Sequence, residues 1–332
     1  MNAEQSSFHI QEAASFAKAF LDASPYPPTG AQKRAVADIV QDFEKSHPMA
    51  RLLEGDVGAG KTLVAAATAY AAVRSRPPGR NSGTLQVAYM APTEILAGQH
   101  FQSFIQFFKD HPINIALMTG SGCKKFPSKV SRDKATDISR SQLLKWVASG
   151  EIAMLVGTHA LIQKSVKFQH LAYAIVDEQH RFGTRQRRAL ARKGDAAPHF
   201  LSMTATPIPR TLALTIYGDL DISVLDELPP GRAKITTKIV RPEERESAYD
   251  AVRKELEKGR QAYVICPRIN EPDPAKINAL QAKSAKAEAA RLQKDVFPEY
   301  TVGLLHGAMK PKEKDEAMLD FSAHKIDILV AT

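Results

Sequence analysis

The chain has 332 residues, of which 44% are hydrophobic, and 45 lysines and arginines against 36 acids give it a formal net charge of +9. This composition indicates a globular protein of about two domains and favours, weakly, a polyanionic partner. It excludes a disulfide scaffold and a membrane-spanning protein, because Cys123 and Cys266 form no pair or metal spacing and no apolar run approaches ~20 residues. The N-terminal segment lacks the pattern of a signal peptide, so we expect a reducing, cytoplasmic location.

Short apolar runs alternate with helical patterns in the first two thirds of the chain. Helices are expected over residues 62–76 and 94–110, where apolar residues recur at helical spacing. Strands are expected over residues 51–55, 85–92, 113–120, 152–159, 172–178 and 200–206. This rhythm is typical of an α/β fold with a parallel sheet and helices on both faces.

A second series of elements follows Pro229, Pro230 and Gly231, which break any helix and indicate a hinge. Strands are expected over residues 233–240, 261–267, 300–307 and 326–332, and helices over residues 246–259, 275–294 and 311–321. We expect the last strand to leave unpaired backbone groups exposed. The predicted organisation is a helical lead-in over residues 1–24, a first lobe over 25–228, a hinge over 229–233 and a second lobe over 234–332.

The segment GDVGAGKT, from Gly55 to Thr62, fits the phosphate-loop pattern G-x-x-x-x-G-K-[ST] between a predicted strand and a predicted helix. Its glycines let backbone N–H groups converge on phosphate oxygens, and the helix N-terminus adds partial positive charge. Lys61 can reach the β- and γ-phosphates of ATP, and the Thr62 hydroxyl can ligate Mg²⁺. The predicted nucleotide-binding residues of this loop are Gly55, Asp56, Val57, Gly58, Ala59, Gly60, Lys61 and Thr62.

The segment AYAIVDEQH is an apolar strand that ends in two acids. Asp177 emerges at the carboxyl end of this strand, where ligands bind in open α/β sheets, and is predicted to hold Mg²⁺. Glu178 is then placed to orient or deprotonate the attacking water, so Lys61, Asp177 and Glu178 are the predicted catalytic residues. His159 and His180 do not indicate zinc, because no second ligand occurs at metal spacing.

Several segments together resemble superfamily 2 DNA helicases: TGAQKRAV, GDVGAGKT, MAPTEILAGQH, DEQHRFG and MTATPIPRTLALTIYGDLD. With DELPPGR and GLLHGAMKPKEK, the chain is most similar to the RecG branched-DNA helicases, over about residues 25–332. The nearest alternative is the transcription-repair coupling translocases, which share the DE-HRFG pattern and TATPIPRT. The resemblance implies two RecA-like P-loop NTPase lobes with parallel sheets. The second lobe is expected to be truncated, because the family's arginine block does not follow, and the family's N-terminal wedge domain is also not found.

The resemblance also implies roles for individual residues. Gln32 would hydrogen-bond the adenine edge, with Tyr26 packing on the base. Coupling between the nucleotide site and the DNA path is implied for Gln179, His180, Thr204, Ala205 and Thr206. The nucleic-acid track would be lined by Pro92, Thr93, Gly120, Thr158 and His159 in the first lobe and by His306 and Gly307 in the second.

The function implied is that of an ATP- and Mg²⁺-dependent DNA helicase or translocase acting on branched or forked DNA in recombination and repair. Fork reversal and Holliday junction branch migration are the reactions expected, carried out by a monomer in the bacterial cytoplasm at the nucleoid, with single-stranded DNA-binding protein as a further partner. Because the arginine block does not follow, we expect this chain to be an incomplete motor that binds ATP with Mg²⁺ through its first lobe and hydrolyses it little. One alternative is a truncated, ATP-dependent DNA-binding module without turnover. A P-loop ATPase unrelated to DNA is disfavoured by TATPIPRT and APTE, which such proteins do not need.

Overall fold

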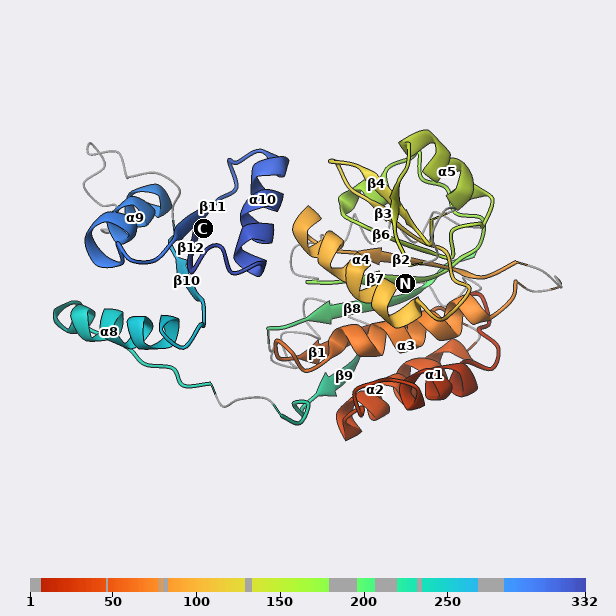
Figure 1. Ribbon diagram of the computed structural model, residues 1–332. Coiled ribbons are helices and arrows are strands. Elements are labelled where there is room, and N and C mark those ends of the chain that lie inside the picture. The colour runs from red at the N-terminus through yellow and green to blue at the C-terminus, as the bar shows by residue number, and fades with distance from the viewer. Residues whose placement is uncertain are drawn as a thin grey trace, which may run out of the picture. The chain divides into compact units, whose positions relative to one another are not determined.

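The computed structural model describes residues 7–45, 47–77, 79, 83–128, 133–178, 196–206, 220–231, 235–267 and 284–332. The chain divides into two compact units, Met1–Ala233 and Lys234–Thr332 (Figure 1). None of the described helices combines the length and the apolar content that a bilayer crossing needs.

The first unit is built around one large sheet. Its strands are β1 (Ala50–Gly55), β2 (Gln86–Met90), β3 (Ile115–Met118), β4 (Cys123–Phe126), β5 (Thr136–Asp137), β6 (Met154–Gly157), β7 (Leu171–Val176), β8 (His199–Thr204) and β9 (Asp221–Leu225). They form a nine-stranded sheet in the order β5-β4-β3-β6-β2-β7-β8-β1-β9. All neighbours are parallel except β3–β4 and β4–β5, which are antiparallel. Strands β1, β2, β3, β6, β7 and β8 lie where the sequence predicts strands. The strands β4, β5 and β9 are not among the predicted ones.

The helices of the first unit cover both faces of this sheet. Within the described residues they are α1 (Ala13–Asp22), α2 (Gly30–Phe43), α3 (Lys61–Arg74), α4 (Glu94–Phe108), α5 (Arg140–Ala148) and the 3₁₀ turn η1 (His159–Ile162). Alternate residues of one strand enter different cores: Val87 and Tyr89 of β2 pack with α1 to α4, and Ala88 and Met90 pack with α5. Figure 1 shows α1, α2 and α3 layered along one side of the sheet.

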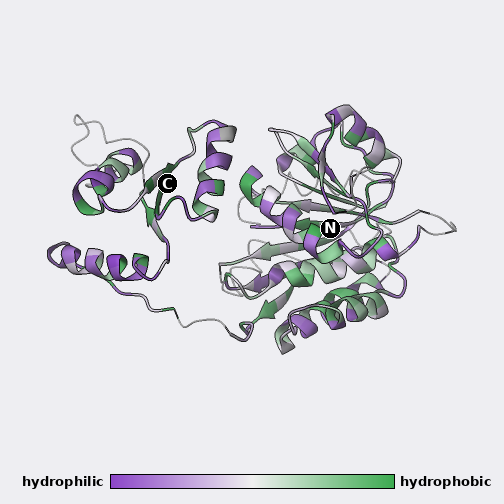
Figure 2. Cartoon of the chain, viewed as in Figure 1, coloured by the Kyte–Doolittle hydropathy of each residue, from purple (hydrophilic) through white to green (hydrophobic). Residues whose placement is uncertain are grey.

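Helix α3 occupies the centre of the larger core. Every residue from Leu63 to Val73 is buried, and α1, α2 and the sheet enclose the helix. A helix that is apolar all round can be stable only when it is enclosed in this way. Figure 2 shows the contrast with the second unit, in which α8 (Arg245–Leu256) is largely hydrophilic.

The second unit contains a small parallel sheet of β10 (Ala262–Ile265), β11 (Val302–Leu305) and β12 (Ile328–Ala331), in the order β10-β12-β11. Besides α8, its described helices and turns are η3 (Pro242–Glu244), α9 (Ala285–Arg291), the π-helical turn η4 (Leu292–Val296) and α10 (Pro311–Ser322). The expectation of an exposed last strand is wrong, because β12 is the central strand and Ile328, Leu329 and Val330 are fully buried. In the described sheet β10 and β11 are the edge strands, and Tyr263 and Ile265 of β10 are exposed.

Two other predictions for this unit concern residues 233–240 and residues 275–294. The strand predicted over residues 233–240 is absent from its described part, residues 235–240, where Ile235 and Ile239 are 75% and 98% exposed. A strand needs a hydrogen-bonding neighbour, and the small sheet provides none for this segment. Of the helix predicted over residues 275–294, the described part forms α9 and the first residues of η4. The rest of that range lies outside the described residues.

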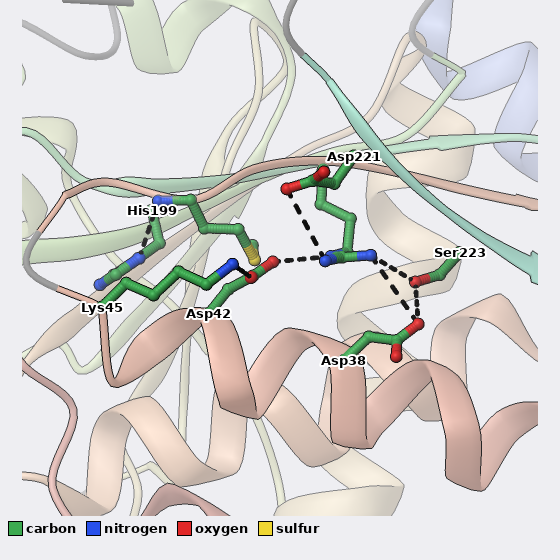
Figure 3. Close-up of polar contacts among 8 residues, drawn as sticks. Asp38, Asp42, Lys45, His199, Asp221 and Ser223 are labelled. Atoms are coloured by element: carbon green, nitrogen blue, oxygen red, sulfur yellow. Dashed lines mark hydrogen bonds and ion pairs between the residues drawn. The ribbon is translucent and has the colours of Figure 1, made fainter. Parts of the chain in front are cut away.

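A buried ion-pair network ties α2 to two strands of the sheet. Arg51 Nε donates to Asp42 Oδ2 at 2.7 Å, and its Nη1 donates to Ser223 Oγ at 2.9 Å (Figure 3). Ser223 Oγ donates to Asp38 Oδ2 at 2.6 Å, and Lys45 Nζ reaches Asp42 Oδ1 at 2.6 Å. Burial alone would raise the pKa of Asp42, but the hydrogen bonds and charges of Arg51 and Lys45 outweigh it and lower that pKa. The network therefore holds α2, β1 and β9 together.

His199, at the start of β8, anchors the N-terminal segment. Its Nδ1 accepts the Met49 N–H at 3.1 Å (Figure 3). Its Nε2 donates to the Phe8 carbonyl at 2.8 Å. This arrangement needs a neutral imidazole, because a proton on Nδ1 would face another N–H. Burial lowers the pKa of His199 to about 4. The hydrogen bond to the Phe8 carbonyl and the charge of Asp42 act in the opposite direction, because both favour protonation.

Replacing Arg51 with methionine should destabilise the first unit. We expect Arg51→Met to lower its free energy of unfolding by about 3 kcal/mol, because Asp42 stays buried without its main partner. Trp146, the single tryptophan, lies in α5, so its fluorescence in urea reports this unit. The control Lys18→Ala breaks an exposed pair with Asp22 and should change the value by under ~0.5 kcal/mol. A loss below about 1 kcal/mol for Arg51→Met would contradict the role of the network.

The stability of the first unit should fall as the pH falls from 6.5 toward about 4. In this window the unfolded chain protonates His199 and the folded chain does not, so acid favours unfolding by about 1.4 kcal/mol per pH unit. Urea unfolding followed by Trp146 at several pH values measures this slope. His199→Gln should flatten it by close to this amount, and an unchanged slope in the variant would show that His199 does not carry it.

Candidate active site

The loop between β1 and α3 has the backbone that phosphate binding requires. β1 ends at Gly55 and α3 begins at Lys61, while Gly58 and Gly60 take φ angles of 80° and 85°, which glycine tolerates. A Cβ on Gly55 would lie 2.8 Å from Leu225 Cβ, so a larger residue does not fit there. Within the described part of the chain no side chain caps α3, and the Leu63 and Val64 N–H groups donate to the Gly60 carbonyl, which leaves the N–H groups of Lys61 and Thr62 at the start of the helix for an anion.

Lys61 lies inside this loop. Its Nζ donates to the carbonyl oxygens of Gly55 at 2.6 Å and Asp56 at 3.1 Å. Burial lowers the pKa of Lys61, while the charges of Asp177, Glu178 and Asp56 oppose that shift. The two acids predicted for the metal and the water therefore act on the same ammonium group that the loop holds.

The sheet brings these residues to one edge. β7, β8 and β1 are parallel neighbours, with Val176 opposite Ser202 and Glu54 opposite Thr204. Carboxyl ends of parallel strands lie at the same edge, which is where open α/β sheets bind ligands. Asp177, the end of β8 and the phosphate loop therefore line one edge of the sheet, with β8 between the other two.

Asp177 is held from three sides. Its backbone N–H donates to the Met90 carbonyl at 2.9 Å, and its Oδ1 accepts the Glu178 N–H at 3.1 Å. Its Oδ2 lies 2.9 Å from Nε2 of His100, on α4. Glu178 takes a φ of 52°, a left-handed conformation that costs a non-glycine residue energy and is common at functional sites. His100 is not among the predicted site residues, because a single histidine on a helix gives no local signal.

Gln32 connects α2 to the phosphate loop. In the capping box of α2, its Oε1 accepts the Thr29 N–H at 2.9 Å. Its Nε2 donates to the Ala59 carbonyl at 2.8 Å, and the side chain is buried. Both ends of the amide therefore bind the protein, and the predicted adenine contact would have to replace or share one of these bonds. Tyr26, predicted to pack on the base, is 72% exposed.

The predicted coupling residues fall into two groups. Thr204 and Thr206 form a compact turn after β8, in which Thr204 Oγ1 lies 3.0 Å from Thr206 Oγ1 and accepts the Thr206 N–H at 3.2 Å. Ala205 lies between them and is partly buried. Gln179 and His180 lie outside the described residues.

The residues predicted to line the nucleic-acid track in the first lobe follow three adjacent strands. β3, β6 and β2 are parallel neighbours, so the loops after them share the edge that carries the phosphate loop. The Thr93 hydroxyl caps α4 by accepting the Leu96 N–H at 3.2 Å. The structure brings the following residues to this edge: Pro92, Thr93, Gly120, Thr158 and His159.

The second unit carries the remaining predicted nucleic-acid residues. His306 and Gly307 follow β11, and Gly307 is exposed whereas His306 is buried. The His306 N–H donates to Met309 Sδ at 3.4 Å, and within the described residues its buried Nδ1 has no hydrogen-bond partner.

The residues of the first unit fit a nucleotide bound with magnesium. Gly58 and Gly60 adopt the positive-φ backbone that lets successive N–H groups form an anion-binding nest, and Lys61 provides the cation. Mg²⁺ is commonly held by one or two protein oxygens together with phosphates and waters, and Thr62 and Asp177 would be such ligands. Across the described ranges, no cluster of three or more histidine, cysteine or acidic residues could hold a metal by itself.

Comparison with protein families and curated proteins gives consistent matches. The DEAD/DEAH box helicase family matches residues 29–215, and the helicase conserved C-terminal domain matches residues 247–332. ATP-dependent DNA helicase RecG of Aquifex aeolicus is 46% identical over 318 residues, which are 96% of this chain and 37% of that protein. RecG of Escherichia coli K12 is 46% identical over 94% of this chain and 42% of its own length. The chain thus spans about two fifths of these relatives.

Solved structures agree with this comparison. A structure of RecG bound to a three-way DNA junction has a TM-score of 0.69 and 34% identity, and the match covers 99% of this chain and 39% of that one. The DNA-bound helicase MrfA, 16% identical with a TM-score of 0.62, shares the fold. The predicted α/β class with RecA-like lobes is confirmed by these similarities, and so is the predicted resemblance to RecG.

A methyl group at Gly60 should displace the Gln32 amide. Gly60→Ala places a Cβ 2.2 Å from Gln32 Nε2, so we expect a loss of roughly 1–3 kcal/mol in the stability of the first unit, read from Trp146 in urea. In a Gln32→Ala background this loss should shrink by about 0.5 kcal/mol or more. Gly83→Ala, at a φ of 95° with its nearest neighbour Pro77 3.8 Å away, controls for backbone strain. Strict additivity of the two changes would contradict the contact.

Proposed function

Because the chain belongs to the DEAD/DEAH box helicase family, we propose that it is the motor part of an ATP-dependent DNA helicase that acts on branched DNA. The observation that carries this proposal is the shared sheet edge. The phosphate loop, Asp177 and the loops after β2, β3 and β6 all leave the sheet on the same side. Nucleotide and nucleic acid would then bind to neighbouring segments of one rigid sheet.

For the nucleotide, the backbone N–H groups from Gly55 to Thr62 would hold the phosphates. Thr62 and Asp177 would be the protein ligands of Mg²⁺, and Lys61 would move from its two carbonyl partners toward the terminal phosphates. ATP supplies the phosphoanhydride that is cleaved, and Mg²⁺ neutralises its charge. Glu178 would orient the water and accept its proton.

Residues 25–228 and 234–332 would act as the two lobes of the motor, joined by residues 229–233. Thr204, Ala205 and Thr206 lie at the end of β8, between the strands that carry Asp177 and the phosphate loop. A change in the conformation of this turn would therefore affect both the strand before Asp177 and the strand before the phosphate loop, which supports a coupling role. Pro92, Thr93, Gly120, Thr158 and His159 would contact the DNA backbone through hydroxyl and N–H groups.

The proposed substrate follows from the relatives. One solved RecG is bound to a three-way DNA junction, and RecG proteins are the relatives at 46% identity. We infer a branched or forked DNA substrate and a role in recombination and repair. A monomeric motor in the bacterial cytoplasm, with single-stranded DNA-binding protein as a partner, fits this proposal.

Replacing Lys61 with alanine should abolish the nucleotide function. Loss of a charge-assisted hydrogen bond to phosphate should weaken binding of a fluorescent ATP analogue with Mg²⁺ by at least roughly tenfold. Turnover of ATP on a forked DNA should fall to background in Lys61→Ala. Lys18→Ala, on the exposed face of α1, is the matched control and should behave as the unchanged chain.

DNA binding should survive in Lys61→Ala and should weaken steeply as salt rises, because phosphate contacts release counterions. Equal nucleotide affinity in Lys61→Ala and the unchanged chain would overturn the assignment of the phosphate loop. Binding of ATP and DNA without turnover would instead identify a DNA-binding module.

A further inference from the structure

His100 makes a contact that the proposed reaction does not yet use. Its Nε2 lies 2.9 Å from Asp177 Oδ2, and both side chains are largely shielded from solvent, at 15% and 11% exposure. The other carboxylate oxygen of Asp177 accepts the Glu178 N–H. Each oxygen therefore has one fixed partner, and the plane of the carboxylate is set by the protein.

Tyr89 also contacts His100. Its hydroxyl lies 3.2 Å from His100 Nδ1 and 3.3 Å from Nε2, and the two rings are 4.8 Å apart. Tyr89 is fully buried, and burial, with the charges of Asp177 and Glu178, raises its pKa well above the ordinary value, so it stays a neutral phenol. The imidazole tautomer that carries its proton on Nε2 donates a hydrogen bond to Asp177, and the Tyr89 O–H contacts the same ring.

His100 belongs to the helix that begins in the predicted nucleic-acid track. The N-cap of α4 is Thr93, and the Glu94 carboxylate accepts the Gly120 N–H at 2.7 Å. Glu94 and His100 are six residues apart, roughly 9 Å along the helix axis. Between and beyond them, α4 is fixed in the larger core by Ala97, Phe101, Phe104, Ile105 and Phe108. A displacement at the start of α4 would therefore be transmitted to His100 through a rigid element.

We propose that His100 is a positioning residue that orients Asp177 for the magnesium-bound nucleotide and ties it to the α4 end of the nucleic-acid track. Histidines and carboxylates that hold a metal ligand in place typically change metal affinity 10- to 100-fold when they are removed. The proposal deepens the proposed function and rests on it. It assigns the contact between α4 and Asp177 a role in how DNA binding alters the metal site.

Three variants at position 100 test the hydrogen bond. His100→Gln keeps an N–H donor near the position of Nε2, His100→Asn keeps an amide that is too short, and His100→Leu removes the donor. His111→Leu is the matched control, because His111 makes a similar contact with the Tyr70 hydroxyl, at 3.4 Å, just after α4. Urea unfolding followed by Trp146 shows which variants fold.

The measurement is the affinity of Mn²⁺, a spectroscopic substitute for Mg²⁺, for the complex of the full chain with ADP. Electron paramagnetic resonance reads it without turnover, and it is repeated with forked DNA. We expect His100→Leu and His100→Asn to weaken Mn²⁺ binding roughly 10- to 100-fold while ADP binding without metal changes little. His100→Gln should stay within roughly threefold of the unchanged chain, and His111→Leu should match it. The effect of DNA on Mn²⁺ affinity should be lost in His100→Leu and His100→Asn.

Several results would overturn the proposal. If the unchanged chain binds Mn²⁺–ADP and folded His100→Asn binds it equally well, His100 does not position Asp177, and the proposed function stands. If His100→Gln loses as much affinity as His100→Asn, the donated hydrogen bond is not the cause. If the unchanged chain binds no Mn²⁺–ADP, the proposed function itself fails, and this inference fails as well because it rests on that function.

Discussion

The parallel pairing of β7, β8 and β1 is the constraint on which the candidate site depends. The three strands end at one edge, so Asp177, Thr204 and Gly55 are brought together although they are far apart in sequence. An antiparallel neighbour in this position would send one of these residues to the opposite edge. The residues of β7 are buried along its whole length, which is typical of parallel strands covered on both faces.

Helix α2 stabilises this arrangement by contacting both ends of β1. At the amino end, Asp42 of α2 binds Arg51. Just beyond the carboxyl end, Gln32 from the first turn of α2 binds the Ala59 carbonyl inside the phosphate loop. The helix thus fixes the strand and the loop that follows it relative to each other. The capping box of α2 therefore serves the candidate site as well as the helix itself.

Much of the fold and part of the site could be predicted from the sequence, because those signals are local. The glycines and Lys61 of the phosphate loop stand within eight residues, and a buried strand directly precedes Asp177. The contacts of His100 and Arg51 could not be predicted, because each depends on a partner that only the folded sheet or its helices bring close. His100 and Asp177 are in contact although they are 77 residues apart in the sequence, and no spacing rule indicates such a pair.

The same distinction explains the errors in the second unit. The pattern of residues 326–332 predicts a strand correctly, but a strand's place in the sheet depends on its neighbours, and β12 proves to be central. Residues 235–240 have a strand-like composition, yet composition supplies no hydrogen-bonding partner. Which of two similar apolar runs becomes a strand, and where it pairs, is decided by long-range contacts.

The enclosure of α3 limits how the nucleotide site can respond to a ligand. From Leu63 to Val73 the helix touches core on every side, so sliding or rotating it would open voids throughout the larger core. Any adjustment of the candidate site to bound phosphates would then come from the five residues between Gly55 and Lys61, where Val57 is 66% exposed. The ligand would reshape a short loop against an immobile helix, and the Ala59 carbonyl would carry that change to Gln32.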